Sequence, residues 1–288
     1  MDIMKYDAFL KIVELGSLTK AADELGYTQA GISHILNSVE KEWGLSLLTR
    51  DRSGVRLTSE GIQLLPLIRN VYLANQDLQN EIGEIHGLDS GLIRIGGLAS
   101  LAAHWLPEVI KAFRLEYPHI NFELIHGDYR DIEDWVREGR IDCGLLKLPI
   151  GEDLESINIG KDNLVVILPE DHPLAGRKYF PPQSLSDEPL LLVEDMLEQE
   201  LAEFFNKFQI KPDVRFVSSD DYAVIAMVEI GLGISLLPEL LLRRTPYKIV
   251  VKDLKETSTR ELGVAVRDSK HASPAVRRFL DFVKGSPI

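Results

Sequence analysis

Hydrophobic positions near the N-terminal end recur with the spacing of two short helices that cross at a tight turn. In the stretch 18–39, LTKAADELGYTQAGISHILNSV, small and apolar residues mark the inner face of a first helix. Gly26 stands where that helix would end in a left-handed conformation, which glycine adopts without strain. Ile32, Ile35 and Val39 repeat at helical spacing on a second helix, which passes closely over the small side chain of Ala22. The pattern is typical of a helix-turn-helix.

The outer face of the second helix is polar. Side chains that can hydrogen-bond to the edges of bases stand there, so we predict that this helix reads DNA. The predicted contacts are Thr28, Gln29, Ser33, His34 and Asn37. An earlier amphipathic stretch, 2–15, predicts a helix that packs beneath the pair.

Two short segments joined by a turn follow the second helix. Within LSLLTRDRSGVRLTSEG, residues 45–61, Ser53 and Gly54 are typical of a hairpin turn. Arginines cluster on this hairpin, and we predict that they reach phosphates or the minor groove. They are Arg50, Arg52 and Arg56. The whole N-terminal region is therefore predicted to be a winged helix-turn-helix.

Apolar residues then alternate at spacings of three and four over residues 59–86, which is the seam of a long helix. A seam of this kind needs a partner helix, so we expect the chain to dimerise here. Asn75 would fix the register, and Pro66 falls near the start, where we expect a kinked entry to the helix. The seam positions are Leu64, Ile68, Val71, Asn75, Leu78, Ile82 and Ile85. Residues 87–91 are a predicted linker.

Strand and helix patterns alternate in the remainder of the chain, which predicts two α/β lobes with a cleft between them. The first series places strands at 92–96, 120–125 and 142–146 and helices at 102–116 and 131–137. The second places strands at 164–168, 214–217 and 234–237 and helices at 197–208 and 222–230. A last strand, 261–266, and a helix, 274–283, return to the first lobe.

Charge and cysteine content restrict the function. The chain has 288 residues with 32 basic and 45 acidic side chains, and its net charge of -13 argues against indiscriminate coating of nucleic acid. One cysteine, Cys143, allows no intrachain disulfide, and no secretory leader or apolar run of about 18 residues is present. We therefore expect a cytoplasmic protein that is not in a membrane, with Cys143 as a small buried residue.

The chain resembles the LysR-type transcriptional regulators over almost its whole length. The resemblance rests on 9–48, on the wing at 52–61, on Trp105-Leu106-Pro107, and on FRLEYPHINFEL at 113–124, REGRIDCGLL at 137–146, LPEDHPLAG at 168–176 and VEIGLGISLLPE at 228–239. It implies a winged helix-turn-helix, a dimerising linker helix, a two-lobed effector domain of periplasmic-binding-protein architecture, and a homotetramer. His34 departs from the family pattern, which has arginine there, and Gly31 weakens the first turn of the reading helix.

The corresponding boundaries are 1–58 for the DNA-binding domain, 59–88 for the linker helix and 89–288 for the effector domain. Within the last, we assign 91–162 and 266–288 to lobe I, and 163–265 to lobe II.

Effector contacts are expected beyond the carboxyl ends of the strands, where the lobes meet. Ser100 occupies, by resemblance, the family's effector-binding position, and several other strand ends are acidic. We therefore predict an effector that carries an amine or other cationic group besides any carboxylate. The alternative is that the acidic residues and Ser100 are helix caps. The predicted contacts are Ser100, Asp128, Tyr129, Glu194 and Asp220.

Together these features predict a sequence-specific transcriptional regulator controlled by a small molecule. An enzyme is the first alternative, but the sequence has no Gly-x-Ser-x-Gly elbow, no catalytic carboxylate pair and no nucleophilic Cys/His pairing. An architectural DNA protein is the second, and the acidic balance argues against it. The seven histidines show no metal-ligand spacing, so we expect no metal and no cofactor.

Overall fold

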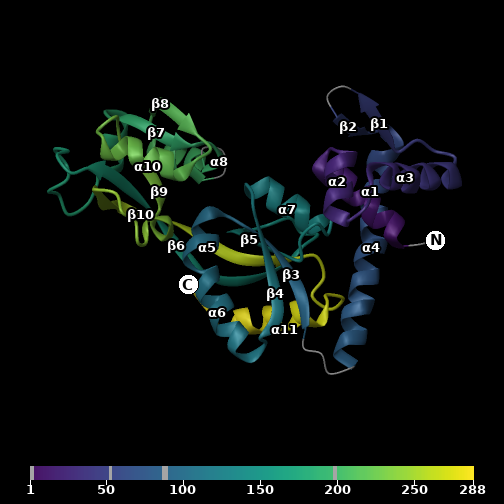
Figure 1. The fold of residues 1–288 in the computed structure, drawn as a ribbon. Coiled ribbons are helices and arrows are strands. Elements are labelled where there is room, and N and C mark those ends of the chain that lie inside the picture. Colours follow the sequence, from purple (N-terminus) through teal and green to yellow (C-terminus); the bar gives the residue numbers. More distant parts are fainter. Residues whose placement is uncertain (1–2, 52–53, 86–89, 197–199) are drawn as a thin grey trace.

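The computed structural model describes residues 3–51, 54–85, 90–196 and 200–288. A small N-terminal module is joined by the long helix α4 to a larger α/β region with two lobes (Figure 1). Separate hydrophobic cores fill the N-terminal module and each lobe. The predicted fold class, a winged helix-turn-helix followed by a linker helix and a two-lobed α/β domain, is confirmed.

The N-terminal module is a three-helix unit with a two-stranded wing. Its elements are α1 (Ile3–Leu15), α2 (Leu18–Leu25), α3 (Gln29–Trp43), β1 (Leu48–Asp51) and β2 (Gly54–Leu57). Ser17 caps α2 by accepting a hydrogen bond from the Lys20 amide, and Gly26 ends it with a φ of 71°. The wing strands pair antiparallel, as the turn signal predicted.

The small and apolar positions of the helix pair lie in one core. Ala21, Ala22 and Ile32 are at most 1% exposed, and Val39 is 2% exposed. The predicted crossing of the two helices over Ala22 therefore agrees with the structure. Leu36 is also buried in this core, which widens the inner face of α3 beyond the positions that the sequence pattern singled out.

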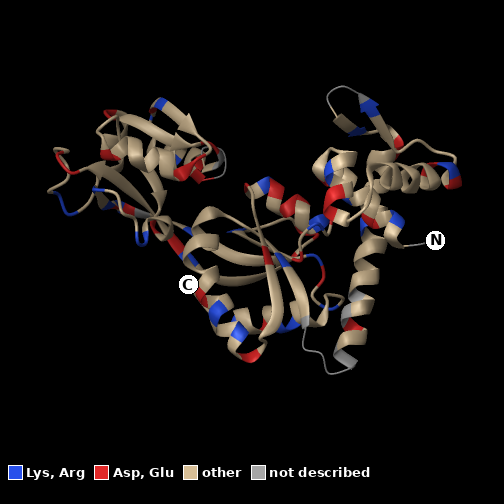
Figure 2. Ribbon diagram, in the orientation of Figure 1, with Lys and Arg blue, Asp and Glu red and all other residues tan. Residues whose placement is uncertain are grey.

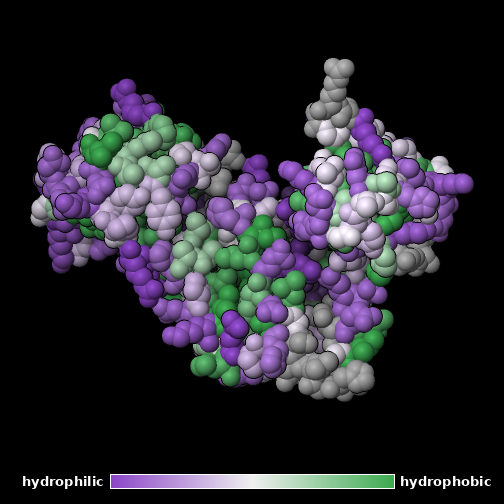
Figure 3. Space-filling view, in the orientation of Figure 1, coloured by the Kyte–Doolittle hydropathy of each residue, from purple (hydrophilic) through white to green (hydrophobic). Residues whose placement is uncertain are grey.

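Helix α4 is one continuous element, Ser59–Ile85, that runs through Pro66. The predicted seam divides into two parts: Leu64 and Ile68 pack into the core of the N-terminal module, whereas Val71, Leu78 and Ile82 are exposed and Asn75 is half-buried. The side chain of Ile85 lies outside the described residues. The first two seam positions are therefore not available to a partner helix, because the module beneath them already covers them. The exposed apolar face consists of Leu67, Val71, Leu78 and Ile82, and Figure 3 shows a hydrophobic area over the lower part of α4.

Another face of α4 is fixed to the first lobe. Arg69 pairs with Glu138 at 2.5 Å, and the Arg94 guanidinium donates to the Gln76 amide oxygen at 3.1 Å. A third bond, 2.7 Å long, joins the Arg267 guanidinium to the Asn70 side chain. These contacts tie the linker helix to the lobe.

The first lobe is built on the parallel strands β4-β3-β5, as the alternating pattern predicted. Helices α6 and α11 pack on one face of the sheet, and α7 packs on the other. The elements are β3 (Ser90–Gly97), α5 (Ala99–His104), α6 (Leu106–Glu116), β4 (His119–His126), α7 (Tyr129–Arg137), β5 (Cys143–Leu148) and α11 (Pro274–Lys284).

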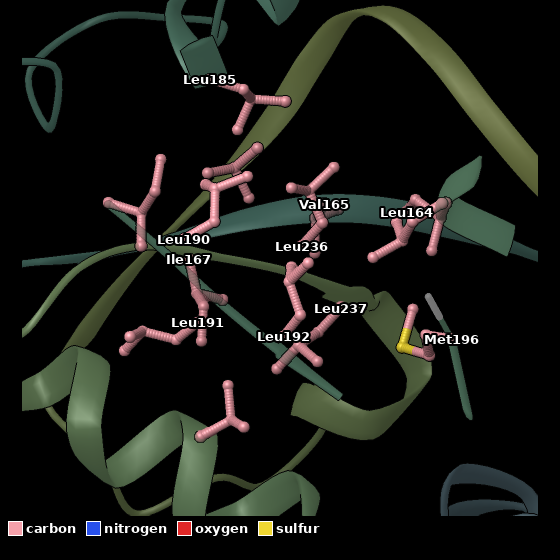
Figure 4. Packing of buried hydrophobic residues seen from close by; sticks show 14 of the residues in the cluster. Leu164, Val165, Ile167, Leu185, Leu190, Leu191, Leu192, Met196, Leu236 and Leu237 are labelled. Carbon is pink, nitrogen blue, oxygen red and sulfur yellow. The ribbon is translucent and has the colours of Figure 1, made fainter. Parts of the chain in front are cut away.

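The second lobe packs its helices around a leucine-rich core. Figure 4 shows the leucines of β7 beside residues of β9 and of the neighbouring long strand, with Met196 at the edge of the cluster. Strand β7 was not predicted, because none of the strands expected from the sequence includes residues 189–193. The elements are η1 (Pro182–Ser186), β7 (Pro189–Val193), α8 (Glu194–Met196), α9 (Ala202–Phe208), β8 (Asp213–Ser218), α10 (Asp221–Glu229), β9 (Ser235–Pro238) and η3 (Glu239–Leu242).

Two long antiparallel strands, β6 (Glu155–Pro169) and β10 (Ile249–Val266), run through both lobes and join them. Residues 261–265 of β10 pair with β5, so the chain has already returned to the first lobe before residue 266. The predicted lobe boundary at 265/266 is therefore too late, and β10 is much longer than the predicted strand 261–266. Its earlier part was missed because KDLKETSTR, residues 252–260, lacks an apolar alternation.

Candidate functional site

The polar face of α3 is accessible, and the helix is capped at its start. Thr28 is the N-cap residue, and its hydroxyl oxygen accepts a hydrogen bond from the Gly31 amide at 3.1 Å. Gln29, His34 and Asn37 are exposed on the following turns, while Ser33 is half-buried. The predicted base-reading residues therefore share one accessible helix face, with Thr28 also stabilising the helix start.

The wing contacts this face through one arginine. Arg50, on β1, donates hydrogen bonds to the Ser33 hydroxyl at 3.1 Å and to the Asn37 side-chain oxygen at 3.4 Å. Arg56 is exposed on β2, and Figure 2 shows the basic positions of the wing. The predicted contact Arg52 lies outside the described residues. Arg50 thus connects the wing to two side chains of the reading helix.

A buried arginine stands where the two lobes meet. Arg260, on β10, is 4% exposed, and all five of its N–H groups are used. Nε and Nη2 both donate to Asp162 Oδ2, at 3.1 and 2.8 Å. Nη2 also donates to Ser100 Oγ at 2.8 Å, and Nη1 donates to Tyr129 Oη at 3.1 Å and to Glu200 Oε1 at 3.2 Å. We call these five residues the Arg260 cluster.

The cluster draws on both lobes and on both connecting strands. Ser100 and Tyr129 lie at the starts of α5 and α7 in the first lobe, and Glu200 comes shortly before α9 in the second. Asp162, on β6, is the cross-strand partner of Arg260, and its second carboxylate oxygen accepts from the Leu240 amide at 3.0 Å. The hydrogen bond from the Tyr129 hydroxyl to Glu200 is a direct link between the lobes.

Electrostatics keep the Arg260 guanidinium charged and the Tyr129 hydroxyl protonated. Burial alone would lower the pKa of Arg260, but the adjacent Tyr129, Glu200 and Asp162 raise it above its ordinary value. Burial, reinforced by Glu200, raises the pKa of Tyr129, so its hydroxyl keeps its proton and donates. One guanidinium thus faces two carboxylates. Glu200 Oε2 is buried and has no hydrogen-bond partner among the described residues.

A cavity of about 40 Å³ adjoins the cluster. Tyr129 and Arg260 line it together with apolar side chains such as Leu98, Val193 and Met196. A cavity of this size admits water, whereas binding sites for drug-sized molecules typically occupy hundreds of cubic ångströms. The protein's own side chains therefore nearly fill the space immediately beside the cluster, whereas a cavity of about 440 Å³ lies on the other side of Tyr129, lined also by Glu203 of the second lobe.

The structure separates the predicted effector residues. Ser100 and Tyr129 are brought together at Arg260. The carboxylates of Asp128 and Asp220 act as N-caps, accepting from the Asp131 amide and from the Tyr222 and Ala223 amides, which is the alternative that the sequence left open. Glu194 is exposed at the start of α8. An effector contact by Asp128, Glu194 or Asp220 stays a prediction.

Sequence reasoning missed three members of the cluster. The signal was present: Asp162 stands two residues before the apolar run 164–168, and Arg260 immediately precedes the last predicted strand. Charged residues at the ends of core strands point to buried pairs when they are brought together by the fold. Nothing in the local sequence around Glu200 singles it out, because its partners are distant along the chain.

The remaining features that the sequence raised are Cys143, a metal site and a membrane-spanning helix. Cys143 is buried in β5, where burial, with a smaller effect of Asp142, raises the pKa of its thiol well above the ordinary value. The part of the chain that the structure describes gathers no group of three His, Cys, Asp or Glu side chains suited to a metal ion. Across residues 3–51, 54–85, 90–196 and 200–288, no helix has the length and apolar character needed to cross a bilayer.

Comparison with known proteins agrees with this architecture. Residues 4–62 match the model of the bacterial regulatory helix-turn-helix proteins of the lysR family, and residues 86–286 match the LysR substrate binding domain. The HTH-type transcriptional regulator YvbU of Bacillus subtilis is 31% identical over 287 residues, covering 99% of this chain and 98% of YvbU. The probable regulator LrrA of Synechococcus elongatus is 30% identical over 99% of this chain and 97% of LrrA.

A solved structure shows the same fold. Full-length CbnR in complex with its target DNA superimposes with a TM-score of 0.73 at 22% identity, covering 99% of this chain and 100% of CbnR. The family models and the relatives describe regulators, not enzymes. The chain therefore belongs to the LysR family of helix-turn-helix transcriptional regulators, with a DNA-binding module at its N-terminal end and an effector-binding domain after the linker helix.

Proposed function

We propose that the effector of this regulator binds between the two lobes at the Arg260 cluster. The observation that carries the proposal is that Ser100 and Tyr129 of one lobe meet Glu200 of the other on a single buried guanidinium. Any molecule inserted there changes the contacts between the lobes. Since α4 is bonded to the first lobe through Arg69, a change in lobe angle is transmitted toward the reading helices.

The output is sequence-specific binding to promoter DNA. We assign base contacts to the exposed face of α3, with Gln29 and His34 at its centre, and phosphate contacts to Arg56 of the wing. The similarity to CbnR, whose structure contains its target DNA, supports this assignment. Because few basic residues surround α3, affinity depends on pairing two modules on two half-sites. Arg52 completes the proposed wing contacts.

Self-association follows from the exposed apolar face of α4. Val71, Leu78 and Ile82 recur there at helical spacing, and they are 48%, 56% and 40% exposed in the single chain. We assign this face to a dimer contact between linker helices, and two dimers to the homotetramer that the family resemblance implies. We propose that the protein is cytoplasmic, because a transcriptional regulator must reach promoter DNA.

A thermal-shift screen of the full-length protein against a metabolite panel tests the effector site. A hit raises the Tm of the wild type, and Tyr129→Phe, which removes one hydroxyl of the cluster, weakens that response. Tyr179→Phe is the matched control, since Tyr179 is 43% exposed. The hit must also alter the DNase footprint on the promoter. An effector that binds equally well to Tyr129→Phe, or that leaves the footprint unchanged, would contradict the proposal.

A further inference from the structure

A row of three polar side chains runs along the reading helix α3. Gln29, Ser33 and Asn37 are spaced by four residues, and residues at this spacing are neighbours on one face of a helix. Gln29 and Asn37 are exposed, and Ser33 is half-buried. In a helix-turn-helix such a face enters the major groove, where the hydrogen-bond donors and acceptors of each base distinguish it from the others. The donors and acceptors that this row offers therefore decide which bases it fits.

Arg50, on strand β1 of the wing, is bonded to two members of that row through their oxygens. Its Nη1 donates to Ser33 Oγ at 3.1 Å, and its Nη2 donates to Asn37 Oδ1 at 3.4 Å. A guanidinium carries donors and no acceptor, so it bonds to Asn37 only through the amide oxygen. The amide nitrogen is then the end of Asn37 that is left for another partner. Among the residues that the structure describes, no carboxylate forms an ion pair with Arg50.

These two bonds make this part of the reading face a donor of hydrogen bonds. We call Arg50, Ser33 and Asn37 the Arg50 patch. The Asn37 amide nitrogen, the Ser33 hydroxyl and the remaining N–H groups of the guanidinium all donate. A base amino group that approached the second lone pair of Asn37 Oδ1 would bring its positive hydrogens against the positive guanidinium. Without Arg50, by contrast, the asparagine would offer its oxygen and nitrogen together, which is the bidentate pattern that fits adenine.

The chemistry of the base edges identifies the bases that fit the Arg50 patch. In the major groove guanine presents N7 and O6 as acceptors, and thymine presents O4 as an acceptor beside its methyl group. Adenine and cytosine each present an amino group there, which would face the donors of the patch. A patch that only donates therefore fits the keto bases, guanine and thymine. It fits guanine better, because guanine has an acceptor for each of two neighbouring donors.

We infer that Arg50 sets the base preference of the reading helix. By bonding to the oxygens of Ser33 and Asn37 it makes both side chains donors, so each half-site carries guanine, or less favourably thymine, where the Arg50 patch meets the groove. Arg50 acts here through Ser33 and Asn37 and is a positioning residue. This inference rests on the proposed base contacts of α3 and identifies the class of base that its middle turns read.

Selection of bound sequences from a random DNA library by the full-length protein tests the inference. Asn37→Ala identifies the base pair concerned, because it relaxes the wild-type preference at that position. The wild type should favour guanine there over adenine and cytosine by about 5- to 100-fold, the range expected for one bidentate contact. Arg50→Met removes the guanidinium and releases the Asn37 oxygen, so the guanine preference should disappear or turn to adenine.

Two further variants separate this role from a contact through charge alone. Arg50→Lys keeps the charge but lacks the planar fork that reaches both oxygens, so the guanine preference should be lost while the salt dependence of binding is kept. Arg56→Met, on the neighbouring strand of the wing, should weaken binding to all sequences and leave the preferred bases unchanged. Arg50 is exposed, so Arg50→Met is expected to fold, and Arg50→Lys provides the same test if it does not.

Retention of the guanine preference by Arg50→Met, with weaker binding to every sequence, overturns the inference and makes Arg50 a phosphate contact. A wild-type preference for adenine or cytosine at the Asn37 position overturns it too, as does the absence of any position that Asn37→Ala relaxes. Failure of the proposed function has a different signature. If the wild type enriches no sequence, or if both Gln29→Ala and Asn37→Ala leave every preference unchanged, the proposed base contacts of α3 are contradicted as well. A preference altered by Gln29→Ala but not by Arg50→Met refutes the inference alone.

Discussion

Replacing Arg260 by leucine is the most direct perturbation of the lobe contact. The wild-type guanidinium donates five hydrogen bonds, to Asp162, Ser100, Tyr129 and Glu200. The side chains of Asp162 and Glu200 are only 4% and 2% exposed. Arg260→Leu therefore leaves two buried carboxylates without their cation, while the apolar side chain fills much of the same volume.

The expected loss follows from that arrangement. Removing one partner of a buried ion pair costs about 3–5 kcal/mol, because the remaining charge stays buried and unpaired. For a domain of about 200 residues each kcal/mol lowers the Tm by about 2–4 °C, so we expect Arg260→Leu to lower the Tm by roughly 6–20 °C. A variant that also carries Asp162→Asn and Glu200→Gln removes the stranded charges and should recover much of this loss.

Urea denaturation of the full-length protein, followed by circular dichroism and by tryptophan fluorescence, measures the free energy of unfolding. Arg244→Leu is the matched control: Arg244 pairs with Glu108 at 3.0 Å, but the two side chains are 83% and 73% exposed. Such a surface pair contributes about 0–1 kcal/mol. A loss for Arg260→Leu that is no larger than that of Arg244→Leu would refute the view that the cluster holds the lobes together.

Three further predictions address other parts of the molecule. Gly61→Ala should destabilise the N-terminal module by about 1–3 kcal/mol, measured by urea denaturation, because an added Cβ would lie 2.2 Å from the Leu47 carbonyl oxygen. Arg56→Ala should weaken binding to all DNA sequences and reduce the salt slope by about 1, whereas Gln29→Ala should cost about 1–3 kcal/mol mainly on the operator; equal losses on operator and random DNA for Gln29→Ala contradict the assignment. Burial lowers the pKa of His104 in the folded protein, so its contribution to stability is present above its unfolded pKa of about 6.5 and is lost as pH falls below it; His104→Gln should flatten that part of the stability profile, and an unchanged profile argues against it.

Local signals were sufficient for much of the fold. The helix pair of the N-terminal module was predictable because Ala22, Gly26 and Ile32 each satisfy a local requirement of the same crossing. The parallel β4-β3-β5 sheet was predictable because strand and helix patterns alternate without interruption. The seam of α4 was only partly interpretable, since periodicity shows that Ile68 lies on an apolar stripe but not which neighbour covers it.

The Arg260 cluster was beyond local reasoning for a physical reason. Its members stand at positions 100, 129, 162, 200 and 260, and none of these charges or hydroxyls is distinctive until the fold brings them together. Ser100 and Tyr129 lie, as predicted, just after strands of the first lobe and beside the second lobe. The predicted effector contact by these two residues stays a prediction, and in the structure both are bonded to the protein's own arginine.

The two pairs of the cluster are placed differently relative to the lobes: one pair lies on the connecting strands, and the other bridges the two lobes. Asp162 and Arg260 face each other where β6 and β10 pass from one lobe to the other, so we expect their pairing to move little in the proposed rotation of the lobes. Tyr129 and Glu200 are carried by opposite lobes, so their contact is the one that rotation breaks. We therefore expect stability to depend mainly on the Arg260–Asp162 pair, and the response to the proposed effector to depend on the Tyr129–Glu200 contact. Variants of Tyr129 and Glu200 should accordingly change effector affinity more than they change the free energy of unfolding, the reverse of Arg260→Leu.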